Sequence, residues 1–321
     1  MDTRQFGKLG YVSSLSLGGG GLGQLWGETT REECIATVHE AVSQGITLCD
    51  MAPVYGNGEA ETVIGETFKG SLPDGLRITT KCRLGDIRPE DVSAQLAESI
   101  DASLKRMNID HVDIFFLHNW ITFDDAPTYG KGTRRSVVES TVIPEMEQIV
   151  KSGKALSWGL TGIGDPKVLI DMLTSGIQPD FIQIITNLLD SPGALQYPDS
   201  SPQPRDIIAA ARQAGTSIMG IRAVQAGALT NKLDRFKPAD DPESLDFRRA
   251  DPFRSIAREV GKSPAFLAHQ YALSMEGPAT IVLGVKNREE LRECIEAEAA
   301  GPLDSELVDR IDLAVSENPY R

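Results

Sequence analysis

Short apolar runs alternate with longer amphipathic segments along most of the chain. The apolar runs have the length and composition of buried β-strands, and they lie at Leu15–Leu17, Ile46–Cys49, Leu76–Thr80, Val112–Leu117, Ala155–Leu160, Phe181–Ile185, Ser217–Ile221 and Thr280–Leu283. A hairpin is predicted before them, from Gln5-Phe6-Gly7 through a turn at Lys8-Leu9-Gly10 to Tyr11-Val12. Apolar strands separated by helices indicate a parallel sheet that is covered on both faces.

Capping residues mark several of the predicted helices. Thr30 can cap a helix over Arg31–Ser43, with Glu33 as its partner in a capping box. The segment Pro89–Met107 has proline in its first turn and an apolar face. That face consists of Val92, Leu96, Ile100 and Leu104. Glycines that end a helical run before a strand fit the helix C′ position, and they are Gly45, Gly153, Gly176 and Gly215.

The eight strand–helix units favour a closed (β/α)8 TIM barrel over an open sheet. A length of 321 residues allows one large domain or two small ones. No composition break divides the chain, so we expect one barrel domain over residues 1–321. Two long polar segments, Asn119–Arg135 and Leu229–Asp251, follow the fourth and seventh strands and should be catalytic-face loops.

Charge and composition narrow the class of partner. The chain has 32 Lys and Arg against 46 Asp and Glu, a net charge of −14, and 40% of its residues are hydrophobic. An acidic surface disfavours nucleic acid and anionic membranes, so a small-molecule enzyme is the better hypothesis.

No signal peptide and no apolar run of roughly 20 residues is evident. Four scattered cysteines fit free thiols, which predicts a cytoplasmic protein. Its oligomeric state cannot be read from the sequence.

Titratable residues close three successive predicted strands. Asp50 ends the second strand with Tyr55 just beyond it, Lys81 ends the third, and His118 ends the fourth. Each has a purely structural alternative as a cap, a solvated charge, a loop anchor or a hydrogen-bonded histidine. Because the active site of such a barrel lies at the carboxyl ends of its strands, together they indicate one shared pocket.

These four side chains suit proton transfer to a carbonyl group. A phenol with a reference pKa near 10 is a poor acid or base at neutral pH, and a neighbouring ammonium should lower that pKa by stabilising phenolate. An aspartate would keep the lysine charged, and an imidazole can hold the carbonyl oxygen. The set would protonate a carbonyl as hydride arrives, or act in reverse on an alcohol, without a metal ion.

The same residues carry a resemblance to the aldo-keto reductase family. Gly45-Ile46-Thr47-Leu48-Cys49-Asp50 with Ala52, Tyr55 and Gly56 resembles the family's GxxxxDxAxxYG signature, and Asn57-Gly58-Glu59-Ala60-Glu61 with Ile64-Gly65 resembles the stretch that follows it. Lys81 and His118 stand where the family has its other catalytic residues. The resemblance, which runs from the hairpin to about residue 299, implies a catalytic tetrad with Tyr55 as general acid/base.

The resemblance also implies a nicotinamide cofactor. Gln183 matches a family glutamine that contacts the nicotinamide amide, and Thr161 can replace the hydroxyl of a usual Ser-Asn pair, whereas Gly162 offers no amide. After the seventh strand the usual Ser-Pro-Leu loop is absent, and Arg222 is a candidate contact for the pyrophosphate.

The segment after the eighth strand, Leu283 to Cys294, resembles the family's phosphate-binding segment. Gly284 belongs to its loop, and Lys286, Asn287 and Arg288 can meet a 2′-phosphate. Glu290 and Cys294 depart from the usual arginine and asparagine, and a capped surface helix is the structural alternative. We therefore expect NADPH with reduced selectivity, NADH being possible, because a carboxylate near the ribose favours a 2′-hydroxyl.

The predicted function is an NAD(P)-dependent oxidoreductase that reduces an aldehyde or ketone. Trp26 and Trp120, together with Tyr55, are expected to wall the substrate site, although either tryptophan can equally be buried packing. Two alternatives stay open: a sugar or polyol dehydrogenase that works in the oxidative direction, and a nucleotide-sensing regulatory subunit. Neither the substrate nor the direction in the cell follows from the sequence.

Overall fold

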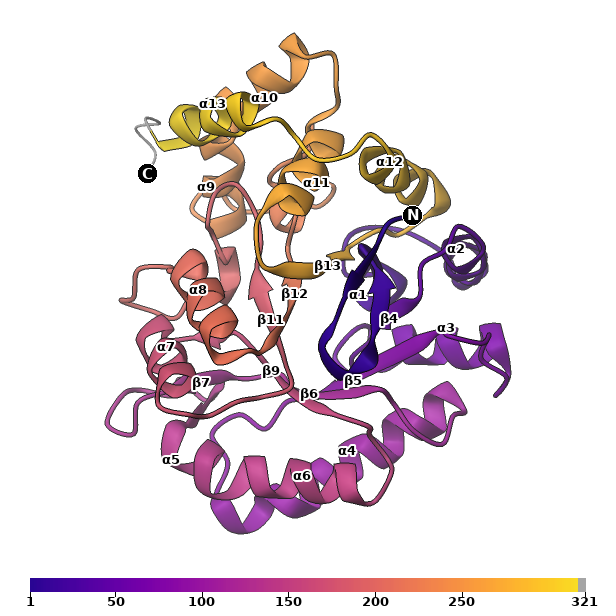
Figure 1. The fold of residues 1–321 in the computed structure, drawn as a ribbon, viewed down its shortest axis with the longest axis vertical. Coiled ribbons are helices and arrows are strands. Elements are labelled where there is room, and N and C mark those ends of the chain that lie inside the picture. The colour runs from indigo at the N-terminus through magenta and orange to yellow at the C-terminus, as the bar shows by residue number, and fades with distance from the viewer. Residues whose placement is uncertain (317–321) are drawn as a thin grey trace.

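The computed structural model describes residues 1–316 and has a closed parallel barrel at its centre (Figure 1). Its strands are hydrogen-bonded in the order β11-β12-β13-β3-β4-β5-β6-β9. Their bounds are β3 Leu15–Gly18, β4 Leu48–Asp50, β5 Arg77–Cys82, β6 Ile114–Leu117, β9 Trp158–Thr161, β11 Phe181–Ile185, β12 Ser217–Ile221 and β13 Pro278–Leu283. The predicted (β/α)8 barrel is confirmed.

Helices surround the barrel. Those of at least eight residues among the described residues are α2 Arg31–Ser43, α3 Glu59–Phe68, α4 Pro89–Met107, α6 Ile143–Lys151, α7 Pro166–Thr174, α8 Pro204–Ala214, α9 Pro242–Arg249, α10 Asp251–Glu259, α11 Pro264–Ser274, α12 Arg288–Ala299 and α13 Ser305–Ser316. Shorter turns are α1 Gly19–Leu22, α5 Arg135–Val137, η1 Gly7–Leu9, η2 Val138–Val142, η3 Gly193–Leu195 and η4 Gln225–Gly227. No helix within residues 1–316 is both long and apolar enough to cross a bilayer.

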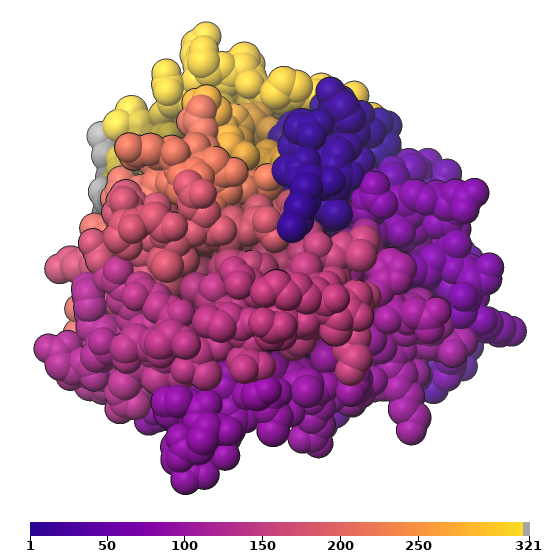
Figure 2. All heavy atoms as spheres, turned by 60° about the horizontal axis from the view of Figure 1, so that its bottom comes forward, coloured from indigo at the N-terminus to yellow at the C-terminus, as the bar shows by residue number. Residues whose placement is uncertain are grey.

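The N-terminal hairpin closes one end of the barrel. It pairs β1 Thr3–Gln5 with β2 Tyr11–Ser13 in antiparallel register. Phe6 lies with its ring centroid 4.6 Å from that of Phe181, the first residue of β11, and is fully buried. Figure 2 shows this indigo segment set against segments from both halves of the chain. Because the hairpin covers the amino ends of the strands, the functional face is the opposite one.

Local signals predicted the helix ends well. Helices α2 and α4 have the expected bounds, and the four glycines predicted to end helices all have positive φ. Thr30 accepts a hydrogen bond from the Glu33 N–H, as a cap should. The capping box is nevertheless incomplete, because the Glu33 carboxylate accepts hydrogen bonds from Arg288 instead.

The extents of two predicted strands and two predicted loops need correction. Val112 and Ala155, the predicted first residues of two strands, form only an isolated bridge with each other, and β6 and β9 begin later. The loop Asn119–Arg135 contains β7 Trp120–Thr122 and β8 Gly132–Arg134, which form a small sheet with β10 Ile163–Gly164. The loop Leu229–Asp251 contains helix α9.

Candidate active site

A cavity of ≈ 530 Å³ opens at the carboxyl ends of the barrel strands. Asp50, Tyr55 and His118 line it over the barrel mouth, and residues of α11 and α12 line it further out. It therefore extends from the centre of the barrel into the groove beyond β13. Its volume lies in the usual range for a small-molecule site, ~300–1,000 Å³.

Lys81 and Asp50 form a buried ion pair beneath this cavity. The Lys81 ammonium lies 2.8 Å from Asp50 Oδ2 and donates to the Met51 carbonyl at 2.7 Å, and the two side chains are 0% and 2% exposed. Asp50 Oδ1 accepts hydrogen bonds from Thr79 Oγ1 at 2.7 Å and from Gln183 Nε2 at 2.8 Å. Burial opposes the charge of Lys81, but Asp50 and Tyr55 outweigh it and raise the pKa of that ammonium. The pair is thus fully hydrogen-bonded, as a buried charge pair must be.

Tyr55 lies beside this pair on the loop between β4 and α3. The Lys81 ammonium is 4.9 Å from the centroid of the Tyr55 ring. Glycines let the loop approach α1 closely: a Cβ on Gly23 would lie 2.5 Å from the Tyr55 carbonyl carbon, and one on Gly19 would lie 3.0 Å from the ring.

The pKa of Tyr55 moves in the direction opposite to our expectation. Burial raises it, and the Lys81 ammonium opposes that rise without cancelling it. The reason is that the phenol is more deeply desolvated than the sequence could reveal. At neutral pH the phenol is therefore protonated and is a proton donor.

His118 faces Tyr55 across the cavity. Their ring centroids are 6.0 Å apart, and the rings are nearly perpendicular at 80°. Burial, followed by the charges of Lys81 and Arg83, lowers the pKa of His118 well below its ordinary value, so the imidazole is neutral. Its Nδ1 is buried without a hydrogen-bond partner among the described residues. His118 as a residue lines the cavity, whereas this nitrogen is shielded from solvent.

Thr161 and Gln183 also line the cavity, and both have partners within the protein. The Thr161 hydroxyl donates to the Leu117 carbonyl at 2.8 Å. The Gln183 amide nitrogen donates to Asp50, so this glutamine joins the ion pair as well as the wall. The structure therefore brings both residues beside the four strand-end groups.

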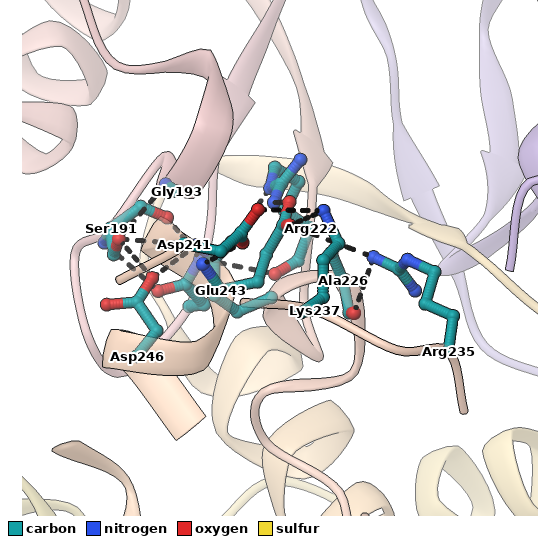
Figure 3. A network of polar contacts seen from close by, with 11 residues as sticks. Ser191, Gly193, Arg222, Ala226, Arg235, Lys237, Asp241, Glu243 and Asp246 are labelled. Atoms are coloured by element: carbon teal, nitrogen blue, oxygen red, sulfur yellow. Dashed lines mark hydrogen bonds and ion pairs between the residues drawn. The ribbon is translucent and has the colours of Figure 1, made fainter. Parts of the chain in front are cut away.

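Arg222 belongs to a polar network that the sequence did not predict (Figure 3). Its guanidinium donates to Gln225 Oε1 at 2.7 Å and to Glu243 Oε1 at 3.2 Å. Glu243, on α9, also pairs with Lys237 at 2.5 Å. Burial lowers the pKa of Arg222 although Glu243 opposes this. Arg222 lines the cavity, and Glu243 holds its guanidinium there.

The loop that carries Arg222 has an unusual backbone. Arg222, Gln225 and Ala226 have φ of 63°, 46° and 51°, in the left-handed region that residues with a side chain rarely adopt. Gln225 Nε2 donates to Asp246 Oδ2 at 2.6 Å, which ties the loop to α9. Such strained backbone is common at ligand-binding sites. The sequence feature that could have indicated this network is the long polar segment Leu229–Asp251, which contains α9 and has charges of both signs.

Only part of the predicted phosphate-binding segment lies at the cavity. Gly284, Lys286 and Glu290 line the cavity, whereas Asn287 and Arg288 do not. Asn287 caps α12 by accepting from the Glu290 N–H at 2.9 Å. Arg288 donates to the carboxylate of Glu33 on α2, at 2.9 Å from Nη2. Asn287 thus stabilises the start of α12, and Arg288 links α12 to α2.

The two tryptophans have different surroundings. Trp26 lines the cavity, and the Arg235 guanidinium lies 4.9 Å from the centroid of its ring. Trp120 does not line the cavity: it is 7% exposed and donates from Nε1 to the Leu195 carbonyl at 3.0 Å. Its ring packs against Tyr197 with centroids 5.6 Å apart. Trp120 is therefore in the packed position that we considered as its alternative.

Further cavity residues were not predicted. Arg83 follows β5, Lys232 and Arg235 come from the long segment after β12, and His269 faces the outer part from α11. Cys294, noted in the sequence as a departure from the family's asparagine, lines the cavity from α12. The cationic side chains of this cavity are donors that fit an anionic nucleotide. No group of three or more His, Cys, Asp or Glu within residues 1–316 has the arrangement of a metal site.

Comparison with known proteins identifies the family. The model of the aldo/keto reductase family matches residues 14–315, and the chain belongs to this family of oxidoreductases. Its members act on small-molecule carbonyl compounds and generally use NAD(P)H.

Individual relatives are distant but match over most of their length. The chain is 24% identical to L-galactose dehydrogenase from Arabidopsis thaliana, covering 92% of this chain and 88% of that one. It is 25% identical to a probable voltage-gated potassium channel subunit beta from Oryza sativa, covering 90% and 89%. A solved structure of the glycerol dehydrogenase from Gluconobacter oxydans shares the fold with a TM-score of 0.73 at 21% identity, covering 100% and 97%.

Proposed function

We propose that this protein is an NAD(P)H-dependent oxidoreductase that reduces an aldehyde or ketone, with Tyr55 as general acid/base. The observation that supports this best is the buried pair of Lys81 and Asp50 against Tyr55, with His118 on the wall of the same cavity. The ion pair of Lys81 and Asp50 lies beside the phenol of Tyr55, and the imidazole of His118 faces that phenol. This arrangement serves proton transfer at one atom.

In the proposed mechanism each residue has one task. The neutral His118 and the phenol of Tyr55 would each donate a hydrogen bond to the carbonyl oxygen and hold it in place. A bound reduced nicotinamide supplies the hydride that the carbonyl carbon accepts. As negative charge grows on the oxygen, Tyr55 gives it the phenolic proton, and Lys81 stabilises the phenolate that is left. Asp50 keeps Lys81 charged and in position. Oxidation of an alcohol would use the same groups in reverse.

The cofactor would lie along the cavity. Thr161 and Gln183 are proposed contacts beside the nicotinamide, and Arg222 is a proposed contact for the pyrophosphate. The outer residues Gly284, Lys286 and Glu290 would face the adenosine half. Our expectation of NADPH depended partly on Asn287 and Arg288, and the bonds of these two residues to other parts of the protein weaken it.

Two alternatives differ in what the same cavity would do. The names of the Arabidopsis and Gluconobacter relatives favour a sugar or polyol dehydrogenase, in which Tyr55 acts as a base. The potassium channel subunit favours a nucleotide-binding regulatory protein. The presence of all four strand-end residues supports an enzyme over a sensor, since binding alone needs no proton donor.

A substrate panel in both directions would test the proposal. Purified protein is assayed with NADPH or NADH against aldehydes, ketones and aldoses, and with NADP⁺ or NAD⁺ against the matching alcohols and polyols. We expect kcat/KM to be highest for a carbonyl compound, with Tyr55→Phe prepared in parallel as a blank for contaminating reductases. Higher kcat/KM for a polyol would select the dehydrogenase, and tight nucleotide binding without turnover on any compound would reject the enzyme.

A further inference from the structure

Charge is unevenly distributed along the cavity wall. Near β12, Arg222 and Arg235 face the cavity, and Glu243 of α9 lies against them (Figure 3). The outer part, between α11 and α12, has a different composition. It is lined by the carboxylates of Asp234, Glu290 and Glu293 and by the ammonium groups of Lys286 and Lys232. A cation-rich inner part and a carboxylate-rich outer part suit different portions of one ligand.

The positive charge of Lys286 is already balanced by carboxylates of the protein. Its ammonium lies 2.5 Å from Asp234 Oδ2 and also pairs with the Glu290 carboxylate. Glu290 additionally accepts the Lys286 N–H through Oε2 at 3.0 Å. Burial opposes the charge of Lys286, yet the bonds to Asp234 and Glu290 outweigh it and raise its pKa. An incoming anion would have to displace two carboxylates from this ammonium.

Of the other cations nearby, Lys232 is exposed to solvent and two arginines are held by other groups. Arg288 is bonded to Glu33 outside the cavity wall. Arg235 lies over the Trp26 ring and donates to the Ala226 carbonyl at 3.2 Å. Glu293 adds a further carboxylate, which accepts a hydrogen bond from Ser263. The two carboxylates paired with Lys286 therefore outnumber its single charge, and Glu293 adds a third carboxylate to the wall.

We propose that Asp234 and Glu290 make the protein select NAD(H) over NADP(H). This inference depends on the proposed function, which lays the nicotinamide near Tyr55 and so directs the adenosine half outward toward Lys286. A 2′-phosphate would bring further negative charge against these carboxylates. A 2′-hydroxyl would instead donate a hydrogen bond to one of them. Asp234 and Glu290 would thereby determine specificity without contacting the reacting atoms.

Binding measured without a carbonyl substrate tests this proposal. NADH and NADPH are titrated separately into the whole protein by isothermal titration calorimetry, at one fixed and low ionic strength. We expect the wild-type Kd to be at least tenfold lower for NADH than for NADPH. In Glu290→Gln and in Asp234→Asn the NADPH Kd should fall at least fivefold, while the NADH Kd changes less than threefold. The double variant should bind the two dinucleotides with similar Kd values.

A matched control and the contrary outcomes complete the test. Glu289→Gln removes a carboxylate from the same turn of α12 but outside the cavity wall, and it should leave the ratio of the two Kd values unchanged. Wild-type protein that binds NADPH as tightly as NADH, or variants that change both affinities alike, would overturn the inference and leave the proposed function standing. Failure to bind either dinucleotide would reject both.

Discussion

Lys81 and Lys286 are both paired with carboxylates at the cavity, and their surroundings differ in every other respect. Lys81 is 0% exposed, comes from a barrel strand and bonds an aspartate that has two further hydrogen-bond donors. Lys286 is 14% exposed, lies in the loop before α12 and bonds carboxylates that are themselves 35–36% exposed. The first pair is part of the barrel interior, and the second is part of its periphery.

The comparison separates two uses of the same chemical pair. A desolvated ion pair has strong interactions, and its partners cannot be removed singly without leaving a buried charge. It therefore suits a task that any change should abolish, such as proton transfer. A partly hydrated pair contributes little to stability and can be altered without unfolding the protein. It suits the choice between two closely related ligands.

The largest expected effect is the difference in stability between the variant that lacks Lys81 and the variant that lacks Lys286. Lys81→Met leaves Asp50 charged and buried, so we expect a loss of about 3–5 kcal/mol in the free energy of unfolding. Lys286→Met should cost less than about 1 kcal/mol, because its carboxylates stay hydrated. Urea unfolding of the two variants measures both values. Equal losses would show that the two pairs do not differ as their burial indicates.

His118 offers the next test, since it contributes to the proposed chemistry but not to a hydrogen-bond network. His118→Phe should lower kcat/KM for a carbonyl substrate by about 10²–10³-fold, the effect of losing one donor to the oxygen. The unfolding free energy should not fall, because Nδ1 has no partner to lose among residues 1–316. Steady-state kinetics and urea unfolding of the same preparation separate the two effects. Unchanged kcat/KM would remove His118 from the mechanism.

His269 gives the outer part of the cavity a pH dependence of its own. Burial lowers the pKa of His269 to about 4, so between about pH 6.5 and pH 4 the unfolded chain binds a proton that the folded protein does not. Stability should fall as the pH is lowered through this window. His269→Gln should reduce that slope by about 1.4 kcal/mol per pH unit. Urea unfolding at pH 6, 5 and 4.5 measures it, and an unaltered slope would contradict the assigned direction.

The smallest effect concerns the cap of α12, which holds the outer part in place. Asn287→Ala removes the hydrogen bond to the Glu290 N–H and should cost about 1 kcal/mol of unfolding free energy. Asp165→Ala removes the equivalent bond at α7, where Asp165 Oδ1 accepts from the Lys167 N–H at 2.9 Å outside the cavity wall, and serves as the comparison. We expect similar losses of stability in both, but a change in the NADH Kd only in Asn287→Ala.

The sequence predicted the barrel and the arrangement at its mouth because both depend on local patterns. Apolar runs mark buried strands, and polar residues that end such runs meet at one edge of a parallel sheet. Asp50, Lys81 and His118 were found in this way. The strands β7 and β8 were missed because they are short and lie in a polar segment, where only their mutual pairing marks them as strands.

The outer part of the cavity depends on long-range contacts that no local pattern shows. Arg288 pairs with Glu33, 255 residues earlier in the chain, and Lys286 pairs with Asp234 from a loop 52 residues away. From the sequence alone, Lys286 and Arg288 therefore appeared free to bind a phosphate. In the structure both are held by carboxylates of the protein. The net rise in the pKa of Tyr55 was missed for a related reason, since the depth of burial is a property of the whole fold.

The role of Tyr55 is tested most directly by the rate of hydride transfer in a single turnover. Wild-type protein and Tyr55→Phe are loaded with saturating NADH, mixed with the best carbonyl substrate, and followed by nicotinamide fluorescence in a stopped-flow instrument. We expect the variant to be at least about 100-fold slower, the usual contribution of a positioned proton donor, with a Kd for NADH within threefold of wild type. A variant that transfers hydride at the wild-type rate would show that the proton comes from another group.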